Sequence, residues 1–227
     1  MKSDITIVND LPDYYDQSKF SSNVKFTGPL FSVPDTDEAV DPEILKVFDP
    51  KNDKPKIFCT LSSSGSEEML KEVIKVFTYG EGLNWNAVIL SPHFSVQKAR
   101  ELVGKREGVY ITDNFIPSPR VNAMADIAVI HGGQGTVQTA IYSGTPIIGV
   151  AVQHEQFINL SNMESRGSGI RISRAKWNTK NIQKSIAKIL ADKRYKESVL
   201  KLEDRIATTN GAKNAADVIW EKIKQIR

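Results

Sequence analysis

One Gly-rich turn, His131-Gly132-Gly133-Gln134-Gly135-Thr136, restricts the local fold of this chain more than any other feature of its sequence. The apolar run 127–130 precedes the turn, and the helix-like run 137–142 follows it. A strand that enters a helix through such a turn directs free backbone N–H groups and the positive end of the helix dipole at one point. The glycines allow a ligand to approach the backbone closely, and His131 and Thr136 can add side-chain donors. The turn therefore predicts either a phosphate site or a tight turn that uses glycine only for its backbone freedom.

A second polar group follows the next apolar run. Residues 147–152 read as a strand, and Gln153, His154, Glu155, Gln156 and Asn159 come directly after it. Open α/β sheets bind ligands at the carboxyl ends of their strands, so we expect this group to lie beside the Gly-rich turn. A phosphorylated sugar would suit both.

Short apolar runs alternate with amphipathic helical patterns from Lys56 onward, which is typical of a parallel sheet covered by helices on both faces. The predicted strands are 56–61, 86–90, 108–112, 126–130, 146–151 and 169–172, and the predicted late helices are 178–190, 193–207 and 212–226. Before this region, two short strands at 5–8 and 24–26 and one short helix near 42–48 are expected. Ser64 and Glu67 have the spacing of a helix capping box.

Composition is ordinary for a soluble globular protein of one or two domains, with 227 residues, 40% hydrophobic and 25% charged. The formal net charge is only +3, and a modest basic concentration occurs at Arg166, Arg171, Arg174 and Lys176. This balance does not favour nucleic acid as a partner. Cys59 lies in an apolar run and reads as a small buried hydrophobe. No secretory segment and no run of about 18 apolar residues occurs, so a cytoplasmic location is expected.

Five motifs in residues 109–170 together resemble the signature region of the family 1 glycosyltransferases. They are Phe115-Ile116-Pro117, the turn 131–136, Gly144-Thr145-Pro146, Glu155-Gln156 with Asn159, and Gly167-Ser168-Gly169. These enzymes use nucleotide diphosphate sugars and have the GT-B fold. The resemblance implies the carboxy-terminal half of that fold, an α/β, Rossmann-like parallel sheet with helices on both faces.

The resemblance also implies roles for individual residues. His131, Gly133, Gln134, Gly135 and Thr136 would hold the diphosphate of the donor. Glu155 and Gln156 would bind sugar hydroxyls, Asn159 would lie on the phosphate side, and Phe115, followed by Ile116, would stack on the base. A serine-rich loop with Ser63 and Ser64 would face the donor phosphates.

The sequence departs from the family pattern at three of these positions. The family usually has Trp where this chain has Phe115 and Gln where it has Ser118. These two substitutions lie at the positions that the family uses to recognise the base and the ribose. The acidic sugar contact is commonly Asp, whereas Glu155 resembles the subgroup of bacterial macrolide and sterol glycosyltransferases.

The family has two domains, and the resemblance predicts how this chain divides between them. Residues 1–33 would be a remnant of the amino-terminal acceptor domain, 34–55 a linker, and 56–227 the nucleotide-sugar-binding domain. The catalytic base is expected in the missing acceptor domain. That domain would be supplied by a separate chain or through self-association, and the alternative is that this chain is a fragment or comes from a truncated reading frame. The acceptor could be a molecule at a membrane surface. The last helix is expected to brace the other domain, although core packing by Trp220 and Ile223 is its simplest interpretation.

The function predicted is the donor-binding half of an inverting glycosyltransferase that transfers a hexose, with a UDP-sugar as the preferred donor. No cofactor and no metal are expected. His154 has no second His or Cys at metal-ligand spacing, and His93 reads as an ordinary loop residue. A non-catalytic nucleotide-sugar-binding subunit is the main alternative, and a GT-B epimerase is a lesser one. A dinucleotide-dependent oxidoreductase is disfavoured, because Gln138 stands where that motif has its third glycine and the turn follows the fourth core strand.

Overall fold

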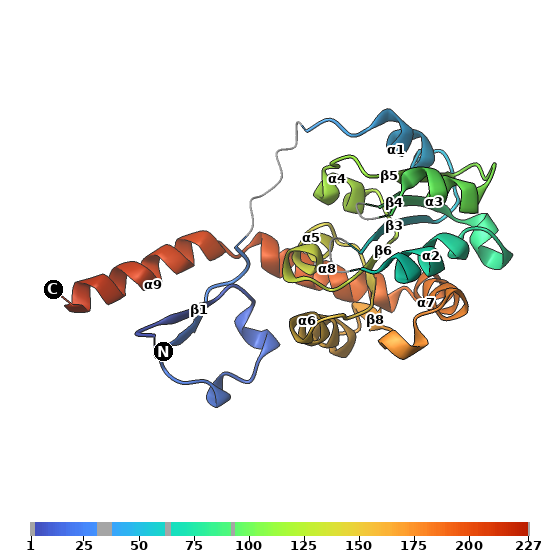
Figure 1. Ribbon diagram of the computed structural model, residues 1–227. Helices are drawn as coiled ribbons and strands as arrows, with labels where there is room; N and C mark the ends of the chain where they lie inside the picture. The colour runs from blue at the N-terminus through green and yellow to red at the C-terminus, as the bar shows by residue number, and fades with distance from the viewer. Residues whose placement is uncertain (1–2, 31–37, 62–64, 92–93, 227) are drawn as a thin grey trace. The chain divides into compact units, whose positions relative to one another are not determined.

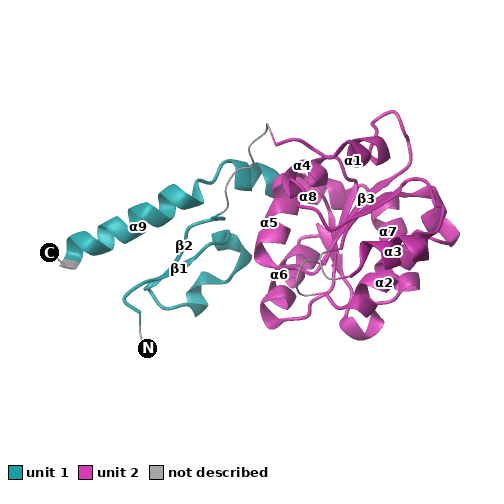
Figure 2. Ribbon diagram, turned by 45° about the horizontal axis from the view of Figure 1, so that its top comes forward, with its two compact units in different colours: residues 1–33, 202–227 teal, residues 34–201 magenta. Residues whose placement is uncertain are grey.

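The structure, a computed structural model, describes residues 3–30, 38–61, 65–91 and 94–226. The chain divides into two compact units, shown in different colours in Figure 2. Unit 1 contains residues 1–33 and 202–227, and unit 2 contains residues 34–201. The chain was expected to divide instead into 1–33, a linker at 34–55, and 56–227.

Unit 2 is built on a six-stranded, fully parallel sheet of order β5-β4-β3-β6-β7-β8 (Figure 1). The strands are β3 (Lys56–Thr60), β4 (Asn86–Leu90), β5 (Val109–Thr112), β6 (Ile127–Ile130), β7 (Ile147–Gly149) and β8 (Gly169–Arg171). The chain starts at the centre with β3, moves outward to β5, and then crosses back to place β6 on the other side of β3. The point where the strand order reverses therefore lies between β3 and β6, where such sheets bind ligands.

Helices cover both faces of this sheet. Successive side chains of each buried strand point to opposite faces, so both faces carry apolar side chains that must be covered. Phe58 and Val88 pack with α1 (Pro42–Val47) and α4 (Ser118–Ala123) on one face. Ile57 and Ile89 pack on the other face, with α2 (Glu67–Val76), α3 (Val96–Val103) and α7 (Thr179–Ala191). The remaining helices of unit 2 are α5 (Gln134–Tyr142) and α6 (His154–Ser165), with the short turns η4 (Gly80–Asn84) and η5 (Arg174–Lys176). The predicted α/β fold with helices on both faces is confirmed.

The described part of the segment expected to be a linker packs against the sheet. Ile44 and Phe48 are buried in the cluster with Phe58. The Tyr110 hydroxyl donates to Asp41 Oδ2 at 2.7 Å, close to the start of α1. Residues 38–48 therefore belong to the packed layer of unit 2.

Unit 1 contains a parallel pair of short strands, β1 (Thr6–Val8) and β2 (Val24–Phe26), together with α9 (Gly211–Ile226). Its 3-10 turns are η1 (Pro12–Tyr14) and η2 (Gln17–Lys19), and α8 (Arg194–Ala207) runs across the division between the units. Asn214 Nδ2 donates to the Thr27 carbonyl at 2.9 Å, which ties α9 to the segment after β2. A Cβ at Gly211 would lie 2.1 Å from the Pro29 carbonyl oxygen, so only glycine fits there.

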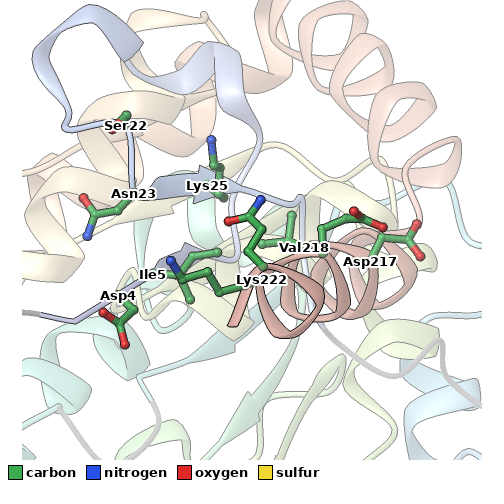
Figure 3. A pocket seen from close by; sticks show the side chains of 10 residues that line it. Asp4, Ile5, Ser22, Asn23, Lys25, Asp217, Val218 and Lys222 are labelled. Carbon is green, nitrogen blue, oxygen red and sulfur yellow. The ribbon is translucent and has the colours of Figure 1, made fainter. Parts of the chain in front are cut away.

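A hollow of about 470 Å³ lies between β1, β2 and α9 in unit 1 (Figure 3). Its lining mixes both signs of charge, including Lys25 and Lys222 with Asp4 and Asp217. The simpler interpretation of the last helix, core packing by Trp220 and Ile223, is wrong, because these side chains are 55% and 39% exposed. Its expected role in bracing the other domain stays a prediction. The helical spacing was predicted correctly, but spacing alone does not provide a packing partner.

Candidate functional site

The Gly-rich turn forms the end of the loop after β6 and the first turn of α5. Gly133 is the N-cap residue and supplies no side chain to the N-terminus of the helix. Gly132 has φ +88°, and a Cβ there would lie 2.6 Å from Leu160 Cγ, so glycine is required. At Gly135, by contrast, a Cβ would meet no atom of the described residues within 4 Å. The backbone at residue 135 therefore borders open space at the positive end of α5.

A carboxylate lies at this helix N-terminus. Glu155 Oε1, from the first turn of α6, accepts hydrogen bonds from the backbone N–H of Gln134 at 3.1 Å and from Asn159 Nδ2 at 2.6 Å. Asn159 is buried and also donates from Nδ2 to the Gly132 carbonyl at 3.0 Å. The predicted residues on the turn and on α6 are thus joined in one hydrogen-bond network. This network already places one negative charge at the N-terminus of α5.

Gln156 has a different environment from the one expected of a sugar ligand. Its side chain is 2% exposed, and its Oε1 accepts from the backbone N–H groups of Val152 at 2.8 Å and Gln153 at 3.1 Å. It forms a capping box at the start of α6. In this arrangement Gln156 orients the helix that carries Glu155, and its sugar contact stays a prediction.

His131 follows β6 directly and is 6% exposed. Burial lowers the pKa of its imidazole, while the Thr60 carbonyl and the charge of Glu155 act in the opposite direction. Among the described residues, its buried Nδ1 has no hydrogen-bond partner. A neutral imidazole can donate one hydrogen bond, but it adds no full charge to the site.

The other predicted site residues that the structure describes follow β5 and β6. Phe115 is 85% exposed after β5, whereas Ile116 is buried with Phe58. Ser118 begins α4 and is partly exposed, and Thr136 in α5 is partly buried. Ser63 and Ser64 lie outside the described residues, as does His93.

The capping box predicted at Ser64 and Glu67 differs from the observed start of α2. The N-cap residue is Ser66, whose hydroxyl accepts from the Met69 N–H at 3.3 Å. The sequence did not predict the bond between Glu155 and the Gln134 amide either. No spacing rule links these residues, because their contact depends on the packing of α5 beside α6.

No group of three or more His, Cys, Asp or Glu residues in the described ranges could hold a metal ion. Within those ranges, no helix has both the length and the apolar character needed to cross a membrane.

The chain is similar to the C-terminal parts of known glycosyltransferases. It is 22% identical over 201 residues to a PGL/p-HBAD biosynthesis glycosyltransferase of Mycobacterium tuberculosis, a match that covers 88% of this chain and 44% of that protein. It is 29% identical over 171 residues to a sterol 3-beta-glucosyltransferase of Vanderwaltozyma polyspora, covering 75% of this chain and 12% of the relative. The chain thus spans less than half the length of these relatives.

Solved structures share the fold. The calicheamicin glycosyltransferase CalG4 superposes with a TM-score of 0.76 at 19% identity, covering 100% of this chain and 54% of that one. The glycosyltransferase of kitacinnamycin gives a TM-score of 0.77 at 18% identity, with 96% of this chain and 55% of that one covered. Fold, motifs and relatives define the C-terminal domain of a family 1 glycosyltransferase of the GT-B type. Residues 92–220 match the model of the erythromycin biosynthesis protein CIII-like C-terminal domain, and the chain belongs to this family.

Proposed function

We propose that this chain is the donor-binding half of an inverting glycosyltransferase that transfers a hexose from a nucleotide diphosphate sugar to an acceptor hydroxyl. A UDP-sugar is the preferred donor. The relatives that it resembles are named as glucosyl-, rhamnosyl- and other glycosyltransferases, which supports sugar transfer as the reaction class. The acceptor-binding domain and the catalytic base would come from outside this donor-binding half.

The observation that carries the proposal is the open N-terminus of α5 at the reversal of strand order. Gly133 leaves the first backbone N–H groups of the helix without a side-chain cap from the N-cap position, and space is open at Gly135. Glu155 shows that a carboxylate is stable at this point, as expected beside a helix N-terminus. A diphosphate needs the same backbone donors.

The proposed chemistry assigns a separate task to each part of this site. The acceptor oxygen attacks the anomeric carbon, the bond from that carbon to the diphosphate oxygen breaks, and the base takes the acceptor proton. The departing diphosphate gains negative charge, which the amides of the Gly133–Thr136 turn and the His131 imidazole would stabilise by hydrogen bonds. Glu155 and Gln156 would contact the hexose hydroxyls, and Asn159 would lie on the phosphate side of the donor. No metal ion is assigned to this step in the proposal.

The decisive experiment is a calorimetric titration of the protein and of Gly135→Asp with UDP, dTDP and GDP and their sugar conjugates. The structure has room for an Asp side chain at residue 135, and a negative charge in the first turn of α5 favours the helix. We therefore expect Gly135→Asp to keep its melting temperature but bind the preferred nucleotide roughly 100-fold more weakly, about 3 kcal/mol from charge repulsion and blocked amides.

Ala212→Asp is the matched control. It adds the same charge to an exposed residue in the first turn of α9, in unit 1. Nucleotide binding should be unchanged in this variant. If no nucleotide binds the unmodified protein, or if Gly135→Asp binds as well as Ala212→Asp does, the proposed donor site is wrong.

A further inference from the structure

The segment from Ser165 to Ala191 carries a strong local excess of positive charge. It contains seven basic residues and no acidic residue, so the rest of the chain has a net negative formal charge although the whole chain is +3. The seven are Arg166, Arg171, Arg174, Lys176, Lys180, Lys184 and Lys188. This segment contains β8, η5 and α7 at one edge of the sheet of unit 2.

A hollow of about 410 Å³ lies within this segment, between the edge strand β8 and α7. Ile170 and Ile172 contribute its apolar lining. Its polar lining is uncharged or cationic: Ser173, Lys176, Asn181, Lys184, Ser185 and Lys188, with Arg171. The volume lies within the range of small-molecule sites.

The lysines of this hollow have exposed side chains. Lys180, Lys184 and Lys188 recur every four residues along α7, and like charges at this spacing destabilise a helix. Within the described part of the chain, no ion pair involves Lys176, Lys184 or Lys188. Two carboxylates lie close to the ends of α7. Glu72 Oε2 accepts from the Thr179 N–H at 2.8 Å, but Glu72 is also paired with Lys75. Asp192 interacts with Lys188 but is held mainly by Arg194. The cationic face is therefore largely uncompensated by the protein itself.

Arg171 is the exception among these cations. Its guanidinium lies 4.4 Å from the centre of the Phe157 ring, and its Nε lies 3.6 Å from Glu164 Oε2. It is thus already engaged on the α6 side. The lysines of η5 and α7, with the Ser and Asn side chains between them, remain to bind a ligand.

We propose that the hollow between β8 and α7 is a second anion site, which binds a multiply phosphorylated group, either a free small molecule or the headgroup of an anionic lipid. Three ammonium groups can each approach a different phosphate oxygen, and the Ser173 and Ser185 hydroxyls and the Asn181 amide can donate hydrogen bonds between them. The apolar lining at Ile170 and Ile172 strengthens these charge interactions relative to bulk water. This site is separate from the N-terminus of α5, and its occupation does not depend on the proposed sugar transfer.

The test uses inositol hexakisphosphate as a soluble probe and phosphatidylcholine vesicles with or without phosphatidylinositol bisphosphate as a membrane probe. Binding is measured for the unmodified chain and for Lys184→Gln/Lys188→Gln, with UDP present to fill the proposed donor site. We expect the double variant to bind roughly 30-fold more weakly, from about a tenfold or smaller loss at each lysine. Higher salt should weaken binding by the unmodified chain.

Lys105→Gln/Lys201→Gln is the matched control, because it removes two exposed charges that do not line the hollow. Gly135→Asp is a second control and should bind both probes as the unmodified chain does. Binding of the soluble probe alone assigns the site to a free phosphorylated molecule, and binding of phosphatidylinositol bisphosphate vesicles that the soluble probe displaces assigns it to a lipid headgroup. The proposal is refuted if neither probe binds, or if the two double variants lose the same affinity.

Discussion

Replacing Glu155 by Ala should separate the contribution of the diphosphate to nucleotide-sugar binding from the contribution of the sugar. The Glu155 carboxylate occupies a backbone N–H group that the diphosphate would use. In the structure, Glu155 Oε1 accepts from the Gln134 N–H and from Asn159 Nδ2. Glu155→Ala therefore removes a negative charge from the N-terminus of α5 and frees the Gln134 amide. It also removes the carboxylate proposed to hold the sugar.

The expected stability change follows from these contacts. Loss of a capping carboxylate costs about 1 kcal/mol, and its interaction with the helix dipole adds about 0.3–1 kcal/mol. Glu155 is solvent exposed, so we take a total of about 1–2 kcal/mol. For a chain of this size, that loss corresponds to a decrease in melting temperature of roughly 2–8 °C.

The expected binding changes have opposite signs for the two ligands. Free nucleoside diphosphate should bind as tightly as to the unmodified protein, or up to about fivefold more tightly, because about 1 kcal/mol of charge repulsion is removed. The nucleotide sugar should bind about 5- to 30-fold more weakly, because sugar hydrogen bonds of about 1–2 kcal/mol are lost. The ratio of the two Kd values is thus the informative quantity.

Isothermal titration calorimetry of UDP and UDP-glucose, with a thermal unfolding scan of each protein, provides these values. Glu43→Ala is the control, because Glu43 is the second residue of α1 just as Glu155 is the second residue of α6. An equal loss of affinity for both ligands in Glu155→Ala would refute the assigned sugar contact. Weaker binding of the free nucleotide alone would show that the Glu155 carboxylate helps to build the phosphate site.

Two further predictions concern the same turn. Gly132→Ala should lower the free energy of unfolding by more than about 2 kcal/mol, because the φ of +88° and the contact with Leu160 both disfavour a Cβ. Gly135→Ala should instead raise the free energy of unfolding by about 0.5–1 kcal/mol. Urea unfolding measures both values, and equal effects of the two substitutions would contradict the geometry. The lowered pKa of His131 means that the unfolded chain takes up a proton more readily, so its contribution to stability is complete above pH 6.5 and is lost as pH falls from there toward the folded pKa. Urea unfolding at a series of pH values should therefore show a steeper loss in the unmodified protein than in His131→Asn, and identical slopes would count against a buried neutral histidine.

The fold was largely predictable from the sequence because each core strand is short, apolar and bounded by turn residues. The predicted strand 86–90 matches β4 without a shift, and 56–61 exceeds β3 by one residue. The segment 34–55 was read as a linker from its Pro and Asp content. Its apolar residues Ile44 and Phe48 nevertheless bury against the sheet, because a few well-placed apolar side chains outweigh the surrounding composition.

The candidate site was only partly predictable. The turn 131–136 could be predicted because its glycines lie between an apolar run that is typical of a strand and a pattern that is typical of a helix. The network of Glu155, Asn159 and Gln134 could not, since it depends on how α6 lies beside α5. Burial of the Gln156 amide at the start of α6 was missed for the same reason, because a motif shows which residues are present but not which of their atoms are already occupied.

The position of the Gly-rich turn within the strand order also argues against the dinucleotide-dependent alternative. In dinucleotide-binding sheets of this order, the Gly-rich turn follows the first strand, and its third glycine lets the helix pack closely on the sheet. Here the first core strand is β3, and the Gly-rich turn follows β6, the fourth. Gln138 stands where the third glycine would be, and its side chain is 4% exposed, so α5 accommodates a buried amide at that point. The two folds share a helix N-terminus beside the reversal of strand order, and the difference lies in which strand leads into it. That difference argues against a nicotinamide cofactor as the ligand at this helix N-terminus.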